Sequence, residues 1–353
     1  RAAGRGTPRM PANRFQPTRV EWNDGIEGPS PVTECRAVQA RSIIARNRSP
    51  DVPFDQSINP YQGCEHGCIY CYARPTHAYL DLSPGLDFES RLTYKENAAA
   101  VLRRELARPG YSCRGITLGA NTDPYQPVER ELRITRQLLE VLRDCHHPFS
   151  IITKSAMITR DLDILSDMAA DGLCSVALSV TTLDADLKRR LEPRAPAGRA
   201  RLSAVEQLSG AGVPVTVLVA PVIPALNDRE LERILELSAA AGARSAAYVL
   251  LRLPLEVREL FFDWLQEHYP LRAEHVTSLL RQSRGGRDND SRFGHRMRGT
   301  GTFADLLEQR FKLACKRHGL ARRETTALRT DLFVPPPTAT GPAHSQIDLF
   351  GGN

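Results

Sequence analysis

An alternation of short apolar runs with longer helical patterns constrains the fold of this 353-residue chain more than any other feature. The apolar runs predict strands at 58–62, 115–119, 149–153, 175–180, 213–220 and 246–251. Helices are expected between them, at 97–106, 130–144, 161–170, 200–210 and 228–241. Parallel strands need such helical crossovers, whereas antiparallel strands can be joined by a short hairpin. The sequence therefore predicts an α/β fold with about six βα units, arranged as a partial (β/α)6 barrel of the TIM type.

Composition divides the chain into four parts. Residues 1–50 are rich in Arg, Pro and Gly and are expected to form a basic, partly disordered N-terminal arm, followed by the core at 51–255. Residues 256–333 are expected to form a basic helical extension over the barrel mouth, with helices at 256–268, 273–282 and 302–318. Residues 334–353 are Pro-rich at their start, which predicts a semi-extended tether.

Three of the eight cysteines, Cys64, Cys68 and Cys71, follow the first expected strand with the spacing CxxxCxxC. Cysteines this close are badly placed for disulfides with one another and well placed to hold a metal centre. Gly63 and Gly67 can supply the positive φ angles that a tight ligand loop needs. We therefore expect a metal centre on this loop.

Two kinds of centre fit three clustered cysteines. Structural zinc sites usually have a second pair of ligands, which this sequence lacks, although His66 could complete a site of three cysteines and one histidine. Three thiolates alone suit a [4Fe-4S] cluster that leaves one iron open to another ligand. The spacing favours the cluster. Such a centre could serve catalysis in an enzyme. The alternative is a non-catalytic iron-sulfur or zinc protein that binds nucleic acid.

The cysteine motif, with Tyr70 before its last cysteine, resembles that of the radical S-adenosylmethionine (radical SAM) family. Further segments together resemble the spore photoproduct lyase-related branch of that family, at 59–64, 70–72, 120–127, 153–155, 179–182 and 192–194. Others resemble one bacterial subgroup of the branch, of unassigned activity, at 252–256, 284–286 and 296–299.

The resemblance implies the partial barrel, a [4Fe-4S] cluster and S-adenosyl-L-methionine (SAM) as cofactors. It also implies an oxygen-sensitive enzyme that cleaves SAM reductively, with electrons from a reductant such as flavodoxin or ferredoxin. The resulting radical would abstract hydrogen from a substrate, in DNA repair or in nucleic-acid modification. The cofactor supplies the difficult chemistry, and the barrel supplies orientation and exclusion of water.

Polar residues fall at the carboxyl ends of the expected strands, which meet at one mouth in a barrel. The resemblance places Thr122 and Asp123 at the methionine amino group, a cation that a hydroxyl and a carboxylate satisfy well. Asp123 could instead start a turn before Pro124. Lys154 is expected to bind the methionine carboxylate or a substrate phosphate, or to extend from the rim into solvent.

Aromatic and hydroxyl side chains complete the expected SAM site. Tyr70 and Tyr72 are expected to contact adenine or to shield the cluster, although tyrosines also pack in cores for area alone. Ser179 and Thr181 are candidates for the ribose hydroxyls, and 222–223 for the adenine face. Three arginines could meet an anionic substrate: Arg194, Arg199 and Arg201.

One departure from the branch concerns the loop at 120–123. The lyases, as the resemblance implies, carry a cysteine there that returns a hydrogen atom to the product radical. This chain has Ala120 and Asn121, neither of which can do so. Pyrimidine-dimer reversal by the same route is therefore not predicted.

Charge is distributed unevenly along the chain. Residues 1–50 carry nine Arg against four acidic residues (+5), 51–270 carry 24 basic against 29 acidic (−5), and 271–333 carry 14 basic against seven acidic (+7). Basic flanks are an electrostatic footprint of a nucleic-acid partner, and they also keep proteins in solution. The link at 281–301, with six Arg against two Asp, predicts either a flexible connector or a lid that grips a polyanion.

The C-terminal pentapeptide 346–350 resembles the motif by which bacterial replication and repair proteins dock on the sliding clamp. A tethered peptide with a glutamine and apolar anchors suits a preformed pocket. The docking residues would be Gln346, Ile347, Leu349 and Phe350. A frayed chain end is the alternative.

The sequence shows no sign of export or of membrane insertion. No apolar run approaches about eighteen residues, and the N-terminal segment is rich in Arg and Pro rather than apolar. The eight cysteines suggest no disulfide framework and fit a reducing compartment. We expect a cytoplasmic protein.

Overall fold

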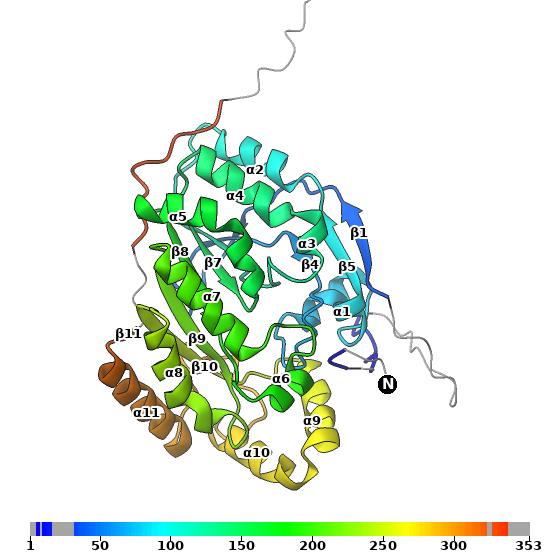
Figure 1. Cartoon of the computed structure of the whole chain (residues 1–353). Helices are drawn as coiled ribbons and strands as arrows, with labels where there is room; N and C mark the ends of the chain where they lie inside the picture. Colours follow the sequence, from blue (N-terminus) through cyan, green and yellow to red (C-terminus); the bar gives the residue numbers. More distant parts are fainter. Residues whose placement is uncertain (1–4, 8, 16–31, 323–326, 338–353) are drawn as a thin grey trace, which may run out of the picture.

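The largest element of the fold is an eight-stranded sheet with the order β11-β10-β9-β8-β7-β6-β3-β2. The computed structural model describes residues 5–7, 9–15, 32–322 and 327–337. The central strands are parallel: β3 (Gln56–Ile58), β6 (Ile116–Leu118), β7 (Phe149–Thr153), β8 (Cys174–Ser179), β9 (Val215–Val222) and β10 (Ser245–Leu250). The edges are β2 (Ala45–Arg46), which is antiparallel, and β11 (Ala321–Arg322). This open parallel sheet confirms the predicted partial barrel (Figure 1).

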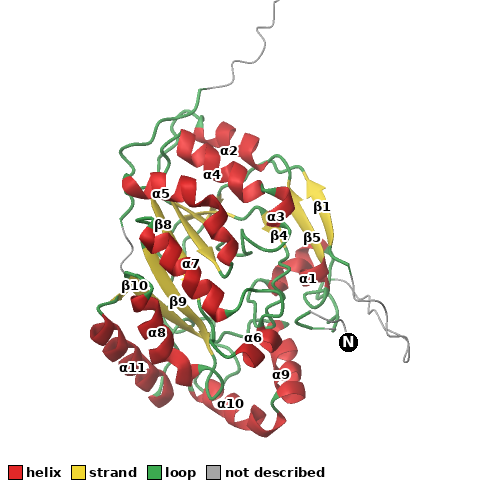
Figure 2. Cartoon of the chain, in the orientation of Figure 1, coloured by secondary structure: helices red, strands yellow, loops and turns green. Residues whose placement is uncertain are grey.

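Helices pack around the outer face of the sheet (Figure 2) and cover its apolar residues. They are α2 (Ala98–Leu106), α4 (Ile134–Asp144), α5 (Leu162–Ala170), α7 (Gly198–Gly210) and α8 (Leu231–Ala240). In α4, Leu138, Leu139 and Leu142 are buried on one face, as a helical repeat of three and four residues dictates. Each helix closes a parallel crossover, so the carboxyl ends of the strands share one edge.

Two predicted elements are each divided in two. The expected helix at 130–144 is α3 (Glu129–Leu132) followed by α4, because Arg133 between them has a φ of 52° and interrupts the helical backbone. The expected strand at 58–62 is β3 followed by β4 (Tyr61–Gln62), which lies in a different sheet. Pro60 between them has no N–H to donate to a strand ladder.

A small sheet with the order β1-β5-β4 lies beside the main sheet. Its strand β1 (Glu34–Val38) runs parallel to β5 (Arg91–Lys95), and β4 is antiparallel to β5. The strands β1 and β2 fall within residues 1–50, so part of the expected arm has regular, paired structure. Between β4 and β5 the chain forms the 3₁₀ helix η1 (Arg74–Leu80) and the short helix α1 (Asp87–Ser90).

The C-terminal helices pack in two places. The first two, α9 (Val257–His268) and α10 (Pro270–Gln282), share an apolar core with α6 (Ala185–Leu191) and with residues 68–70 of the cysteine motif. The third, α11 (Thr302–His318), lies beside α8 and joins the main core (Figure 1). The predicted helical extension is therefore present, and α9 and α10 lie against the cysteine motif.

The link at 281–301 is not a free connector, because its arginines bind other parts of the fold. Arg284 is 1% exposed and donates hydrogen bonds to the carbonyls of Leu250 and Leu251 at 3.0 and 2.7 Å. Arg296 pairs with Asp51, which lies before β3. These contacts fasten the link to the carboxyl end of β10 and contradict the expectation of a flexible connector.

Two sequence expectations concern the chain's surroundings. Within the part of the chain that the structure describes, no helix combines the length and the apolar character that crossing a bilayer requires. The expected clamp-binding residues, Gln346, Ile347, Leu349 and Phe350, lie outside the described residues.

Candidate cofactor site at the carboxyl edge of the sheet

The three cysteines lie on a tight loop after β4, which we call the cysteine loop (residues 63–72). Cys64 N donates to the Phe88 carbonyl at 2.8 Å, which fixes the start of the loop. Gly63 and Gly67 have φ angles of 81° and 65°, which confirms their predicted role. A Cβ atom on Gly67 would lie 2.6 Å from Oε2 of Glu89, so the loop also needs the small residue for space.

A buried ion pair supports the cysteine loop. Arg74 and Glu89 are both 0% exposed and pair at 2.5 Å. Arg74 Nε also donates to the Cys68 carbonyl at 2.9 Å, and Gly6 N donates to Glu89 Oε2 at 2.7 Å. Charge-assisted hydrogen bonds of this kind give the loop a fixed shape before any ligand binds.

The thiols of the loop need a cationic centre in order to ionise. Burial raises the pKa of Cys68 to about 12, and the pKa values of Cys64 and Cys71 are also raised by burial. Metal ligation requires the thiolate, so a bound metal centre would have to displace these protons.

The arrangement of the donors distinguishes the two predicted centres. Among the described residues, no group of three or more His, Cys, Asp and Glu side chains is arranged to hold a single metal ion. In a [4Fe-4S] cluster each cysteine binds a different iron, so the sulfurs need not meet at one point. His66, the candidate fourth zinc ligand, is directed at Asp123, with 3.3 Å between Nδ1 and Oδ2. With His66 directed at Asp123, three cysteines are the donors that the loop offers, and three thiolates suit a cluster with one open iron.

Tyr70 is held by a buried network at the centre of the site. Its hydroxyl donates to Oε1 of Glu192, which also accepts a hydrogen bond of 2.6 Å from Thr181. Arg201, 1% exposed, pairs with the other oxygen of Glu192 and donates to the Ser179 carbonyl at 3.1 Å. Burial alone would raise the pKa of Glu192, but Arg201 and Lys154 lower it to about 2.

This network corrects one sequence expectation. Arg201 was a candidate to meet an anionic substrate. Its guanidinium instead pairs with Glu192 and donates to the carbonyls of Ser179 and Pro196 inside the fold. Of the other two arginines, Arg194 lies 3.2 Å from Glu65 of the cysteine loop, and Arg199 is exposed.

Asp123 lies at the carboxyl end of β6 with both oxygens engaged. Oδ1 accepts hydrogen bonds from the Thr153 hydroxyl at 2.6 Å and from Tyr125 N at 2.9 Å, and Oδ2 accepts from Lys154 N at 2.8 Å. Burial opposes ionisation, but His66 and these hydrogen bonds lower the pKa of Asp123 to about 2. The hydrogen bond from Tyr125 N shows that Asp123 also starts a turn at Pro124, which was the alternative role expected from the sequence.

Thr122 is also engaged with the backbone. It is 2% exposed, and its hydroxyl donates to the Tyr61 carbonyl at 2.8 Å. The backbone N–H groups of Asn121 and Thr122 donate to Oδ1 of Asn59. Thr122 and Asn59 thus join the end of β6 to the chain that enters the cysteine loop.

Three side chains at the carboxyl edge of the sheet are partly or largely exposed. Lys154, half-buried, has its Nζ 5.8 Å from the ring centre of Tyr70. Tyr72 remains 48% exposed, and its hydroxyl donates to the Ala120 carbonyl. Arg252, half-buried after β10, has its Cζ 5.9 Å from the ring centre of Tyr72.

The remaining predicted residues are buried. Ser179 and Thr181 are 3% and 0% exposed at the end of β8. Val222 ends β9, and Ile223 belongs to the apolar core that α9 and α10 complete. The structure therefore brings the predicted residues together at one edge of the sheet, around the cysteine loop. The supporting residues Arg74, Glu89 and Asn59 were missed, because a single charged or amide side chain carries no local signal of the partner that it meets in space.

Comparison with protein families and sequences finds relatives over most of the chain. The family model described as "Radical SAM superfamily" matches residues 58–238. The uncharacterized protein Rv2578c of Mycobacterium tuberculosis is 38% identical over 243 residues, which are 67% of this chain and 72% of that protein. The uncharacterized protein MJ0683 of Methanocaldococcus jannaschii is 26% identical over 241 residues, 68% of this chain and 86% of that protein.

Comparison with solved structures finds the same fold in spore photoproduct lyase. The lyase complexed with dinucleoside spore photoproduct has a TM-score of 0.57 at 15% identity. The alignment covers 82% of this chain and 81% of the lyase chain. A double mutant of the lyase with bound AdoMet and dinucleoside spore photoproduct has a TM-score of 0.56 at the same identity and coverage. At this level of identity the similarity establishes a shared fold.

Proposed function

Because the chain belongs to the radical SAM superfamily, we propose that it is an enzyme that abstracts hydrogen from a nucleic-acid substrate. The family implies a [4Fe-4S] cluster and SAM, and we assign the cluster to Cys64, Cys68 and Cys71. The observation that carries the proposal is the position of these cysteines within the matched segment, on a preformed loop at the edge where the parallel strands end.

When bound, the cluster and SAM supply the radical chemistry, in which SAM is cleaved reductively and hydrogen is taken from the substrate. The chain's own residues bind and orient the cofactors and the substrate, and they exclude water. Water is excluded on one side by the apolar core that α9 and α10 form with Cys68, Ile69 and Tyr70. Tyr70 is held rigid by Glu192, so its ring presents a fixed surface to a ligand.

Lys154 is the proposed partner of the SAM carboxylate. Its ammonium lies over the ring of Tyr70, and its charge acts on Cys68 and Cys71. Asp123 accepts from the Lys154 backbone N–H, so it holds the residue that carries this cation. Because both oxygens of Asp123 are engaged, we assign it this positioning role ahead of direct contact with the SAM amino group. Tyr72, which is 48% exposed, remains a proposed contact of SAM, as does Ser179. The hydroxyls of Thr122 and Thr181 donate to other groups inside the fold, so we assign these two residues a positioning role as well.

Arg252 is the proposed contact of the substrate. Among the described residues, the one hydrogen bond of its guanidinium is from Nη1 to the sulfur of Met297 at 3.7 Å, its buried Nε has no hydrogen-bond partner, and the nearby carboxylate of Asp51 is paired with Arg296. A guanidinium that is half-buried and poorly paired favours an anionic ligand, and a phosphodiester suits its planar donors. The binding of a dinucleoside photoproduct by the structurally similar lyase supports a nucleic-acid substrate.

The proposed reaction differs from that of the lyase. Ala120 and Asn121 stand where the resemblance implies a hydrogen-returning cysteine, and the Ala120 carbonyl accepts the hydroxyl of Tyr72. We therefore propose another radical modification of nucleic acid rather than pyrimidine-dimer reversal.

The experiment is anaerobic reconstitution with iron and sulfide, followed by dithionite and SAM, with chromatography for 5′-deoxyadenosine. Wild-type protein is expected to bind four irons per chain and to form the product, as the family's cluster requires about this content. Cys68→Ala should lose both, whereas Cys174→Ala, a buried cysteine outside the loop, should retain both. Product formation by Cys68→Ala would refute the cluster assignment.

The nucleic-acid assignment has a separate test. Binding of a labelled single-stranded oligonucleotide should weaken by about tenfold or more in Arg252→Gln, because a charged hydrogen bond to phosphate is lost. An oligonucleotide with neutral methylphosphonate linkages should show no difference between the two proteins. Equal loss with both oligonucleotides would show that Arg252 supports the fold rather than a phosphate contact.

A further inference from the structure

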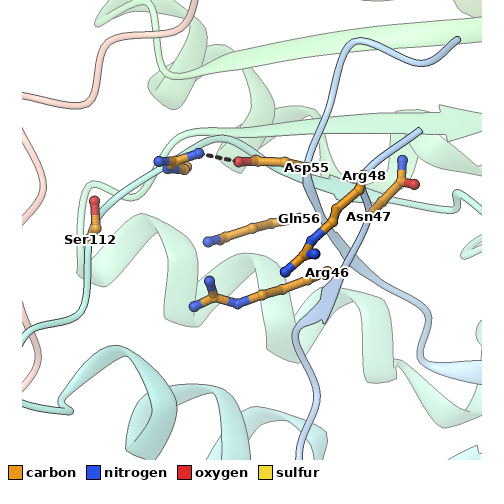
Figure 3. A pocket seen from close by; sticks show the side chains of 7 residues that line it. Arg46, Asn47, Arg48, Asp55, Gln56 and Ser112 are labelled. Carbon is orange, nitrogen blue, oxygen red and sulfur yellow. Dashed lines mark hydrogen bonds and ion pairs between the residues drawn. The ribbon is translucent and has the colours of Figure 1, made fainter. Parts of the chain in front are cut away.

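A cavity of about 290 Å³ (Figure 3) is lined by residues that precede two strands of the main sheet. Gln56 on its wall is the first residue of β3, whereas the cysteine loop follows the carboxyl end of that strand. Ser112 and Arg114, also on its wall, precede the parallel strand β6. The cavity is therefore at the amino edge of the sheet and forms no part of the cofactor site.

The walls of the cavity carry an excess of positive charge. Three arginines line it, Arg46, Arg48 and Arg114, together with one carboxylate, Asp55. Arg114 is paired with Asp55 at 2.5 Å. Within the part of the chain that the structure describes, no carboxylate pairs with Arg46 or Arg48, which leaves two guanidinium groups beside the cavity without a counter-charge.

The floor of the cavity is a built polar surface. Gln56 is 4% exposed, and its side-chain amide lies 3.3 Å from the hydroxyl of Tyr111. That hydroxyl donates to Nε2 of the buried His147 at 2.8 Å, because Nδ1 of His147 donates to the Pro148 carbonyl. The amide of Gln56 is therefore held at the cavity, beside the arginines (Figure 3).

The hairpin that carries Arg46 and Arg48 is held by its own residues. Asn47 N donates to the Asp55 carbonyl at 2.7 Å, and Nδ2 of Asn47 donates to the Phe54 carbonyl at 3.2 Å. Oδ1 of Asn47 accepts from Ser49 N at 2.9 Å. Asn47 therefore shapes the wall, and the donors offered to a ligand come from the two arginines and Ser112.

We propose that this cavity binds a phosphate-bearing anion. Guanidinium groups recognise phosphate through paired, planar hydrogen bonds, and a hydroxyl donor complements them. None of the described residues that line the cavity is aromatic, so they offer no surface on which a base could stack. Its volume is at the small end for ligand pockets, which suits a di- or polyphosphate group more than a whole nucleoside.

Two sources share this chemistry, a free polyphosphate and the backbone of a nucleic acid. Neither requires the iron-sulfur cluster, so the inference stands apart from the proposed function. A protein that fails to cleave SAM can still show the site, and the reverse also holds.

The test is isothermal titration of the full chain with inorganic pyrophosphate at low ionic strength. Wild-type protein is expected to bind, and Arg46→Gln/Arg48→Gln should bind about tenfold or more weakly, because two charged donors are lost. Both arginines are exposed, so the double variant should retain the wild-type circular dichroism spectrum. Arg108→Gln is the matched control, since Arg108 is exposed on the segment that leads to Ser112 but does not line the cavity.

The outcomes separate cleanly. No binding by wild type, or equal binding by wild type and the double variant, would overturn the proposal. A labelled single-stranded oligonucleotide then identifies the source. If pyrophosphate displaces it from the wild type, and the double variant binds it weakly, the natural ligand is a nucleic-acid backbone. If pyrophosphate binding depends on Arg46 and Arg48 but oligonucleotide binding does not, the ligand is a free polyphosphate.

Discussion

Replacement of Glu192 by Gln should destabilise the protein strongly, because it leaves the charge of Arg201 buried without a partner. Both side chains are at most 1% exposed, and loss of one member of such a pair costs about 3–5 kcal/mol. The pKa of Glu192 gives a similar figure: a fall from 4.5 to about 2 corresponds to about 3 kcal/mol. Glutamine keeps the shape and one acceptor for Tyr70, so the loss reports the charge.

The assay is urea unfolding of the protein without its cluster, monitored by circular dichroism. The double variant Glu192→Gln/Arg201→Met removes both charges and should be clearly more stable than Glu192→Gln. Asp186→Asn breaks an exposed pair with Arg189 and should cost at most about 1 kcal/mol. Equal free energies of unfolding for Glu192→Gln and this control would show that the charge of Arg201 does not need Glu192. The same holds if the double variant is no more stable than Glu192→Gln. Because the folded pKa is lowered, the pair's contribution is present above pH 4.5 and is lost as pH falls toward 2.

Three further predictions concern other parts of the molecule. Gly67→Ala should lower the free energy of unfolding by about 1–3 kcal/mol, since φ is 65° and a Cβ would meet Glu89; equal stability in urea would contradict this. Burial lowers the pKa of His147 to about 4, so stability should fall by up to about 3 kcal/mol as pH drops from 6.5 to 4; an unchanged pH slope in His147→Gln would rule this out. Lys154→Gln should weaken SAM binding to the reconstituted protein by about tenfold or more while iron content stays normal, and loss of iron would instead indicate a structural role.

The sequence predicted the main sheet well because apolar residues dominate its strands. In the runs 149–153 and 215–222, alternate residues are buried and most of the others are partly buried, and amphipathic helices separate the strands. The predicted boundaries of α11 and β7 agree with the structure. Local signals failed where the backbone changes direction without a glycine, as at Arg133 between α3 and α4.

The candidate site was predicted only as far as its residues share the end of a strand or a loop. The cysteine spacing predicted a tight loop, which the structure contains, and the strand ends predicted the positions of Asp123 and Lys154 after β6 and β7. The partners of these residues come from distant positions: Asp123 meets His66 and Thr153, and Arg74 meets Glu89. Hydrogen-bond partners of this kind depend on the packed fold, so the sequence could name Asp123 but could not decide between a ligand and a positioning residue.

The apolar core beneath the cysteine loop has a consequence for the order in which the chain is made. Residues 68–70 leave the ribosome early, but Phe261, Trp264 and Val276, which cover them, are synthesised much later. Until α9 and α10 emerge, the loop lacks this apolar cover, although Arg74 and Glu89 are already in the chain. Residues 68–70 therefore stay uncovered by these helices until the last part of the chain has been made.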